Sequence, residues 1–344
     1  MICSLYYDST YCFDNGKGCE SITIRRNPMK RVFLSILFLL VCIGSVFSQF
    51  DAQLSQYMYH HTSFNPAAAG EGGMIQITGQ HRIQWVGMPN AGQTTVFSIN
   101  TPLKIGKSLN GIGFRFVNDK VGLFTNQTAH LQYAFKKHLG TGVLSVGADV
   151  GFVSLGFRGD SVRTIPIGDY HQITDDPEIP TGSEVGMSLD MTLGVFYSTP
   201  KVYAGLSYMH LNRPTVNWGE KSEFQLLSTM YFTGGTHWTL PNPKYVLKPS
   251  TLLKSDFSSM QLDLSTRLEY DNKYWGGLSY RLQDAVVVLA GINIAGGLSI
   301  GYSYDLPTSQ IITVSSGSHE ILLVYSFEYI FGKRTSKYKS IRIL

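Results

Sequence analysis

The side chains most able to do chemistry are histidines, acidic residues and serines, and none of them stands in a catalytic pattern. His60 and His61 are adjacent, so on an extended chain they point in opposite directions and do not share a metal ion. His319 and Glu320 lack the second histidine that a helical zinc motif requires. Asp175-Asp176-Pro177 suits a solvated turn better than a calcium site, and the serines show no recognisable triad. We therefore predict no catalytic residue, no cofactor and no metal ligand.

A clearer pattern is charge carried on one face of a strand, in the segment from Gln261 to Tyr270. Asp263, Arg267 and Glu269 alternate with apolar residues, so the three charges lie on one side. An arginine that faces lipid near the middle of a membrane costs roughly 2–4 kcal/mol. We therefore expect these charges to face the inside of a barrel. The same face of other predicted strands carries Arg82, Arg115, Asp149, Asp190, Arg281, Asp305 and Glu320.

The predicted interior charges have both signs, which favours ion pairing across the lumen. The luminal set is Arg115, Asp149, Asp263, Arg267, Glu269, Arg281 and Asp305. A wide ion-selective pore more often shows one dominant sign. The alternative is that the charges only solvate a water-filled interior.

The elements that position these charges are seen best in the stretch from Thr125 to Ser154. Its first half alternates Leu131, Tyr133 and Phe135 with polar residues, and its second half alternates in the same way. Side chains on a strand point to opposite faces in turn, so each half has one apolar and one polar or small face. The glycines between the halves suit a hairpin turn.

The same unit recurs to the end of the chain, and fourteen strands are predicted in total. Tyr245–Lys254 is the weakest of them, because Pro249 interrupts it. An even number of strands, with short turns on one side and long loops on the other, is typical of an outer-membrane barrel. The predicted strands are Ile75–Val86, Thr94–Leu103, Gly111–Val117, the two halves of Thr125–Ser154, Val185–Ser198, Val202–Leu211, Leu226–His237, Tyr245–Lys254, Gln261–Tyr270, Tyr274–Leu282, Ala285–Ala295, Leu298–Asp305 and His319–Tyr329.

Composition agrees with this fold class, an all-β transmembrane antiparallel β-barrel of the outer-membrane type. Charged residues are 15% of the chain, below the roughly 25% of soluble domains. Aromatic residues reach 12%, and the chain contains 35 glycines. The net charge of +4 is small and scattered, so a nucleic-acid partner is not expected.

An export signal is predicted at residues 29–48. Lys30 and Arg31 precede an apolar run, and Ser48 marks a cleavage edge before Gln49. A transmembrane helix is the alternative, but the run is shorter than the roughly 20 apolar residues that a span needs. Residues 1–28 then read as a mis-assigned upstream extension, with translation beginning at Met29. Residues 49–73 form a periplasmic leader, 74–331 the barrel and 332–344 a basic tail.

The cysteines follow from this division. Three of the four cysteines lie in the upstream extension, and Cys42 lies in the apolar run. A lipid anchor at Cys42 is disfavoured, because Val41 before it is not small and the residues after it stay apolar. The predicted mature chain therefore contains no cysteine, which excludes a disulfide, thiol catalysis and a cysteine metal site.

Several short motifs follow one another along the mature chain, among them Gln56-Tyr57, Asn65-Pro66 with Gly70, and Arg82 followed by Gln84-Trp85. In these motifs and their order it resembles the PorP/SprF family of outer-membrane proteins of the type IX secretion system in Bacteroidetes. The likeness extends from about Gln53 to Tyr329, and residues 1–28 have no family counterpart. Further stretches that carry it are Lys248-Pro249-Ser250, Tyr280-Arg281 with Asp284-Ala285, and Gly301 to Asp305. The motif residues are Gln56, Tyr57, Asn65, Pro66, Gly70, Arg82, Gln84, Trp85, Asn118, Asp119, His319 and Glu320.

The resemblance implies a role in secretion or gliding motility without enzymatic activity. The expected partners are a periplasmic ring component or the C-terminal domain of a secreted adhesin, together with outer-membrane lipid. Both termini are expected in the periplasm. The alternatives are a passive uptake channel for small or apolar solutes and, more remotely, an outer-membrane hydrolase.

Overall fold

The computed structural model describes residues 10–14, 19–23, 51–106, 108–159, 182–218 and 222–328. The chain divides into two compact units, residues 1–47 and 48–344. In the first unit β1 (Thr10–Asp14) and β2 (Cys19–Thr23) form an antiparallel hairpin. The predicted export signal and the basic tail lie outside the described residues.

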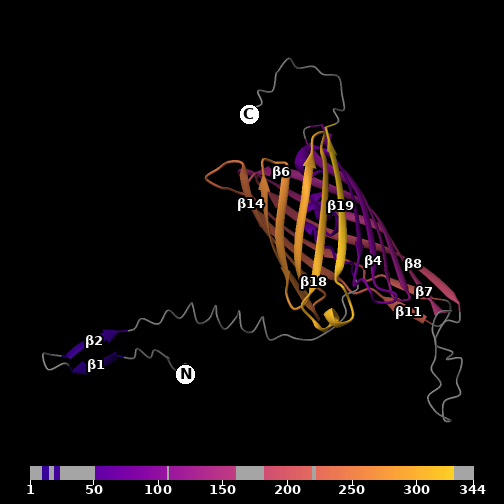
Figure 1. Ribbon diagram of the computed structural model, residues 1–344. Coiled ribbons are helices and arrows are strands. Elements are labelled where there is room, and N and C mark those ends of the chain that lie inside the picture. Colours follow the sequence, from indigo (N-terminus) through magenta and orange to yellow (C-terminus); the bar gives the residue numbers. More distant parts are fainter. Residues whose placement is uncertain are drawn as a thin grey trace, which may run out of the picture. The chain divides into compact units, whose positions relative to one another are not determined.

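The second unit is a closed antiparallel barrel (Figure 1). Its sheet has fifteen strands by pairing, but β13 (Trp238–Thr239) continues β12 after one residue, so fourteen strands form the wall. Pairing of β19 with β3 closes the barrel. This confirms the predicted fold. The wall consists of β3 (Ile75–Ile83), β4 (Gln93–Ile105), β5 (Ser108–Val121), β6 (Phe124–Leu139), β7 (Gly142–Arg158), β8 (Ser183–Ser198), β9 (Val202–Met209), β12 (Thr229–Thr236), β14 (Tyr245–Ser255), β15 (Met260–Tyr270), β16 (Tyr274–Arg281), β17 (Ala285–Ile294), β18 (Leu298–Pro307) and β19 (Ser318–Phe327).

Several predicted strand boundaries differ by a few residues from the structure, as for Gly111–Val117, which is part of the longer β5, and two segments need a structural explanation. The first strand ends at Ile83 and not at Val86, because Trp85 adopts a left-handed backbone with φ 50° that a strand does not contain. The predicted loop from Asn212 to Phe224 contains a hairpin, β10 (Thr215–Trp218) and β11 (Ser222–Gln225). These strands have four residues each, too few for a period of two to be read from the sequence.

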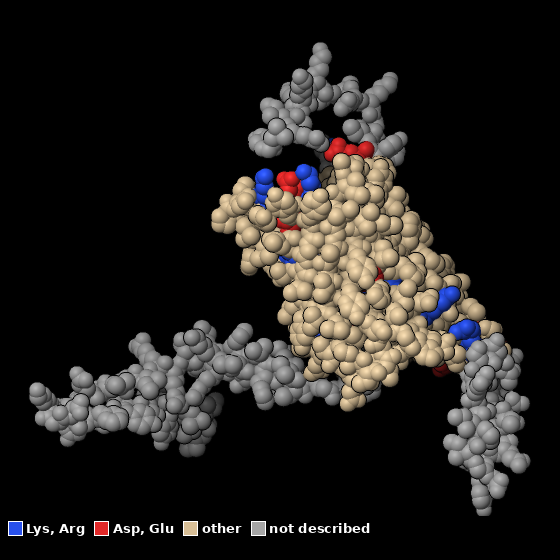
Figure 2. Space-filling view, in the orientation of Figure 1, with Lys and Arg blue, Asp and Glu red and all other residues tan. Residues whose placement is uncertain are grey.

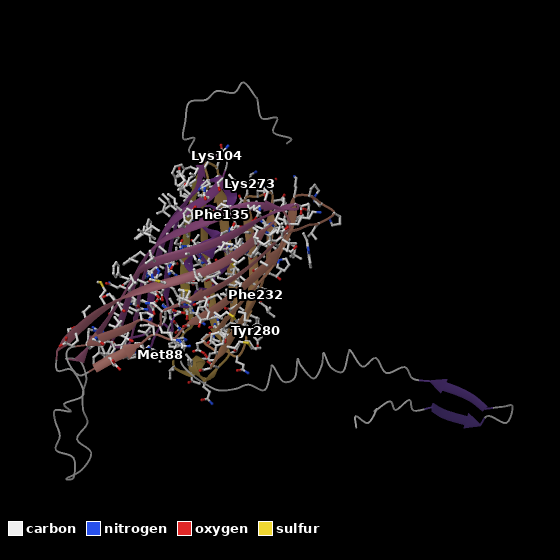
Figure 3. The ribbon with its side chains drawn as sticks, turned by 180° about the vertical axis from the view of Figure 1, so that it is seen from behind. Met88, Lys104, Phe135, Phe232, Lys273 and Tyr280 are labelled. Atoms are coloured by element: carbon white, nitrogen blue, oxygen red, sulfur yellow. The ribbon has the colours of Figure 1, made fainter. Side chains whose placement is uncertain are left out.

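The outer face of the barrel is apolar. Leu131, Phe152 and Leu264 point outward and are 66%, 54% and 51% exposed. On the face seen in Figure 2, the charged residues gather near the two ends, and the surface between them is mostly uncharged. Figure 3 shows the other side of the barrel, where Phe135, Phe232 and Tyr280 lie between the two ends. Such a belt matches the hydrocarbon layer of an outer membrane.

The two ends of the barrel differ in their connections. At one end, which we call the turn rim, short connections follow β4, β6, β8, β13, β15 and β17. At the other end, the loop rim, longer segments follow β3, β7, β9 and β18. Lys104 and Lys273 mark the turn rim in Figure 3, and Met88 marks the loop rim. The first residue of β3 and the last residue of β19 pair with each other at the turn rim.

The part of the leader that the structure describes, residues 51–73, lies inside the barrel. It forms four short 3-10 turns: η1 (Tyr57–Tyr59), η2 (His61–Ser63), η3 (Pro66–Ala68) and η4 (Glu71–Gly73). Tyr57, Met58 and Phe64 pack into one core with inward residues of the wall, among them Trp275 and Leu289. No helix among the described residues is both long enough and apolar enough to cross a membrane.

The direction of the leader could not be read from its sequence. Asp51 contacts His210, which follows β9 at the loop rim. Gly70 lies against Gly111 and Pro102, toward the turn rim where β3 begins. The leader therefore runs through the lumen from the loop rim to the turn rim.

Candidate functional site

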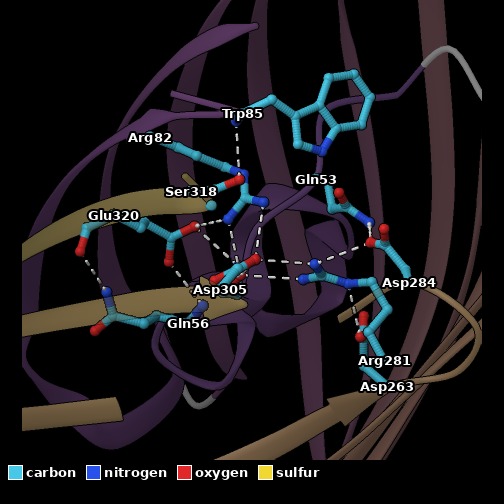
Figure 4. A network of polar contacts seen from close by, with 12 residues as sticks. Gln53, Gln56, Arg82, Trp85, Asp263, Arg281, Asp284, Asp305, Ser318 and Glu320 are labelled. Carbon is cyan, nitrogen blue, oxygen red and sulfur yellow. Dashed lines mark hydrogen bonds and ion pairs between the residues drawn. The ribbon is translucent and has the colours of Figure 1, made fainter. Parts of the chain in front are cut away.

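The first part of the site is a paired charge network on the inner wall near the loop rim (Figure 4). Arg82 on β3 and Arg281 on β16 both contact Asp305 on β18, at 2.8 and 3.0 Å. Arg281 also lies 2.9 Å from Asp263, and Arg82 lies 3.5 Å from Glu320. Both arginines are 1% exposed. A buried charge without a partner is costly, so this pairing stabilises the contacts between β15, β16, β18, β19 and β3.

This network holds the leader through Ser55. The Ser55 hydroxyl donates to Asp305 at 2.7 Å and accepts from Arg82 at 2.8 Å and from Arg281 at 3.0 Å. One donor and two acceptor positions are all that a hydroxyl has, so its hydrogen-bonding capacity is fully used. The backbone N–H groups of Ser55 and Gln56 donate to Glu320 at 2.9 and 2.8 Å. Figure 4 shows Gln56 beside Glu320 on one side of this charge network and Gln53 beside Asp284 on the other.

A second network joins the leader to the opposite wall. His210 lies 3.0 Å from Asp51 and 2.8 Å from Asp190 on β8. His130 on β6 connects Asp190 to Asp149, which also lies 3.5 Å from Arg115. Asp51 further accepts hydrogen bonds from Tyr231 at 3.0 Å and, through its backbone carbonyl, from Lys254 at 2.7 Å.

The ionisation states of Asp51, at the start of the leader, and of His210 follow from these contacts. Burial alone would raise the pKa of Asp51, but the positive charges of His210 and Lys254 outweigh it and lower that pKa below its usual range. Burial alone would lower the pKa of His210, but the carboxylates of Asp51 and Asp190 raise it to about 10. The contact is therefore a buried ion pair at neutral pH.

The Asn-Pro motif holds the leader further along by hydrogen bonds and close packing. Asn65 accepts from the backbone of Ala67 at 3.0 Å and so caps η3. Its amide donates to the carbonyls of Val195 and Leu206 at 3.0 and 3.4 Å. The leader reaches the wall here because Gly194 has no side chain, since a Cβ at that position would clash with Asn65.

Most of the predicted site residues in the lumen meet at the leader. Tyr57 lies 3.1 Å from Ser250, and Gly70 donates its N–H to Asn100 at 3.0 Å. Arg115 donates to the carbonyl of Ser63. The predicted residues that belong to the leader itself are Gln56, Tyr57, Asn65, Pro66 and Gly70. The predicted residues of the wall that contact the leader or its networks are Arg82, Glu320, Arg115, Asp149, Asp263, Arg267, Arg281 and Asp305. Glu269 lies beside them, paired with Lys248 at 2.6 Å.

The remaining predicted residues do not join this site. Gln84 and Trp85 lie at the loop rim, where Trp85 donates its backbone N–H to Ser318 at 3.1 Å. Asn118 accepts from Gln127 on the exposed face, and Asp119 accepts from Thr94 on the inner face. His319 alternates with Glu320 on β19, so it points outward and contacts Tyr302 at 2.6 Å.

Sequence reasoning missed several residues that hold the leader. Ser55 and Asp51 carried no signal, because the leader has no strand period, and His210 follows the end of its strand. His130 and Lys254 could have been found, since they alternate with Leu131 and Leu253 in predicted strands.

The fold and this site define a class of protein, an outer-membrane β-barrel whose lumen is occupied by its own N-terminal segment. A family model described as "Type IX secretion system membrane protein PorP/SprF" matches residues 46–325. The chain belongs to the PorP/SprF family, and it is thus a membrane component of type IX secretion. The family and the fold together place it in the outer membrane.

Solved structures of similar architecture include other outer-membrane barrels. The CymD monoaromatic hydrocarbon channel is 12% identical, with a TM-score of 0.48 over 83% of this chain and 96% of that one. The toluene transporter TbuX of Ralstonia pickettii is 14% identical, with a TM-score of 0.47 over 84% and 97%. The translocator domain of autotransporter NalP from Neisseria meningitidis is 11% identical, with a TM-score of 0.38 over 74% and 87%. No curated protein matches the chain.

Proposed function

We propose that the barrel is a non-enzymatic anchor of the type IX secretion or gliding-motility machinery. It binds a secreted surface protein, such as an adhesin through its C-terminal domain, or a component of the periplasmic ring. The observation that carries this proposal is the leader, which occupies the lumen and is held by buried charges along its first part. A barrel with an occupied lumen acts through what it presents at its rims.

We assign the turn rim to the periplasm and the loop rim to the cell surface, because short periplasmic turns and long external loops are the common arrangement. The wall then begins and ends in the periplasm, with β3 and β19 side by side. The start of the leader lies toward the cell surface in this orientation, which departs from the expectation that the N-terminus is periplasmic. Both rims are thus available to partners, the turn rim to a ring component and the loop rim to a surface protein.

The division of the chain into an upstream extension, a signal peptide and a mature protein is also part of the proposal. We expect signal cleavage after Ser48, so that the mature chain begins at Gln49, two residues before Asp51. N-terminal sequencing of the protein extracted from membranes checks this. A chain that begins at residue 1 and retains Cys3 contradicts both the cleavage and the absence of cysteine from the mature protein.

One observation favours the alternative function of a channel for small apolar solutes. A cavity of about 540 Å³ lies toward the loop rim, lined in part by Val121, Phe124 and Leu227. Asp51 at the start of the leader also lines it, so the leader stands between this cavity and the turn rim. A channel function requires the leader to move.

The test combines conductance with surface display. We expect the purified barrel to conduct poorly in planar bilayers. Deletion of Gln53–Gly70 should abolish display of a cognate adhesin while the barrel still inserts, as judged by heat-modifiable mobility. Large, steady single-channel currents from the intact protein, together with normal display after the deletion, would favour the channel.

A further inference from the structure

A cavity of about 290 Å³ lies between the leader and the wall, toward the turn rim. Tyr59 and Glu71 of the leader form one side of it, and Lys248 of β14 and Arg267 of β15 form the other. Gly72, at the leader's exit, lines the cavity and is exposed, so the cavity communicates with the turn rim. It is distinct from the network that holds Ser55, none of whose charged residues lines it.

The register of the sheet places two cations opposite each other in this cavity. Lys248 and Arg267 are direct partners in the β14–β15 ladder, and both point inward. Like charges in this arrangement destabilise a sheet. Lys248 is compensated by Glu269, whose carboxylate lies 2.6 Å from its ammonium group. Arg267 has no carboxylate at ion-pair distance among the residues that the structure describes.

The surroundings of Arg267 leave its charge uncompensated. Its side chain is 7% exposed, and its guanidinium lies 4.3 Å from the ring of Tyr59 and 5.7 Å from that of Trp275. The aromatic faces attract the cation but accept none of its N–H donors in a strong hydrogen bond. Its Nε is buried without a partner. A planar fork of donors beside a cavity, with one buried N–H unpartnered and no carboxylate at ion-pair distance, has the geometry that binds a carboxylate.

We propose that this cavity is a carboxylate-binding site, and that its ligand is an acidic side chain or a chain terminus of a partner protein that enters from the turn rim. Tyr59, Tyr203 and Thr236 also line the cavity, and each carries a hydroxyl group that can donate a hydrogen bond. The source of the ligand rests on the proposed tethering function. A small free carboxylate has the same chemistry and is the competing source.

The test measures binding by the purified full chain in detergent. The probes are two short glycine-serine peptides that carry an uncharged dye: one ends in glutamate with a free carboxylate, and its twin ends in glutamine amide. We expect the acidic peptide to bind at least about tenfold more tightly than its twin, and Arg267→Gln to remove about tenfold of that affinity. Arg267→Lys should retain part of it. Lys104→Gln, which removes a charge at the same rim outside the cavity, should change nothing.

Three results would overturn the proposal. Equal affinity for the two peptides, which is measurable even where Arg267→Gln fails to assemble, excludes a carboxylate site. Unchanged binding by a folded Arg267→Gln variant excludes this cavity. Acetate that displaces the acidic peptide at equal concentration shows a small-anion site and excludes a protein segment as the ligand.

Adhesin display in cells separates this proposal from the proposed function. Loss of display in Arg267→Gln, with normal insertion of the barrel, supports a tethering role for the cavity. If Arg267→Gln displays the adhesin normally and deletion of the leader abolishes display, the cavity has no role in tethering. The proposed function is then still supported. Normal display in both variants overturns the tethering role of the cavity and the proposed function together, whereas the peptide measurements report on its chemistry alone.

Discussion

The leader is held in two different ways along its length. Its charged segment, Asp51–Gln56, is fixed by ion pairs and hydrogen bonds to buried arginines, carboxylates and His210. Its small-residue segment, Asn65–Gly70, carries no charge and is fixed by uncharged hydrogen bonds and by close contact between alanines and glycines, with Ala67, Ala68 and Ala69 all at most 1% exposed. Charge pairing depends on partners and on pH, whereas close packing depends on volume. The first segment should therefore respond to charge and pH, and the second to side-chain size but not to pH.

The largest effect is expected from Arg281→Leu. This change leaves Asp263 and Asp305 with fewer positive partners in a buried site, and removing one partner of a buried pair costs roughly 3–5 kcal/mol. We expect a lower unfolding midpoint in urea and rapid chymotrypsin cleavage at Tyr57 or Tyr59. Trypsin is unsuitable, since residues 51–74 contain no lysine or arginine.

The control for this variant is Lys273→Gln at the turn rim. Its ion pair with Asp271 is exposed, with side-chain exposures of 65% and 41%, so its loss should leave both measurements unchanged. Equal behaviour of the two variants would mean that the buried network does not hold the leader.

The second-largest effect is expected from Gly111→Val, which tests the small-residue segment. A Cβ at Gly111 would collide with the backbone of Ala69, and overpacking of this kind costs roughly 1–3 kcal/mol. The leader should be cleaved faster near Ala69, for instance by a glutamate-specific protease at Glu71, while its cleavage at Tyr57 changes less. Gly79→Val is the matched control, because nothing lies within 4 Å of a Cβ there. Identical cleavage in the two variants argues against close packing as the second anchor.

The smallest effect is expected from pH. The pKa of His210 is raised from its ordinary 6.5 to about 10, so its contribution to stability is complete below 6.5 and shrinks as the pH rises toward 10. The pKa of Asp51 is lowered, so its contribution is complete above its ordinary 3.8 and is lost as the pH falls further. The charged segment should thus be held best between about pH 4 and 6.5.

The measurement is the difference in thermal unfolding midpoint between the natural protein and His210→Gln. That difference should shrink between pH 6.5 and 9.5, and the Gly111→Val variant should show the same pH dependence as the natural protein. A difference that stays constant over this range would mean that the ion pair does not hold the leader.

The sequence alone was sufficient to predict the barrel. A period of two in apolar residues is a local property, so β6, β7 and β15 could be recognised without any tertiary contact. Even β14 was predicted correctly around Pro249, whose missing N–H removes only one bond from an otherwise continuous ladder. The inward direction of Arg281 and Asp263 followed from the same alternation, because charges cannot face lipid.

Only the tertiary structure decided how the lumen is filled. The contact of Ser55 with Glu320 joins residues 265 positions apart, and the leader has no period that indicates which side chains meet the wall. The left-handed backbone of Trp85 and the four-residue strands β10 and β11 were likewise invisible, because they depend on local contacts and not on a repeated pattern. The alternation of residues along a strand determines which side chains face the lumen. The leader has no such alternation, so its contacts are decided by the shape of the lumen that the closed barrel encloses.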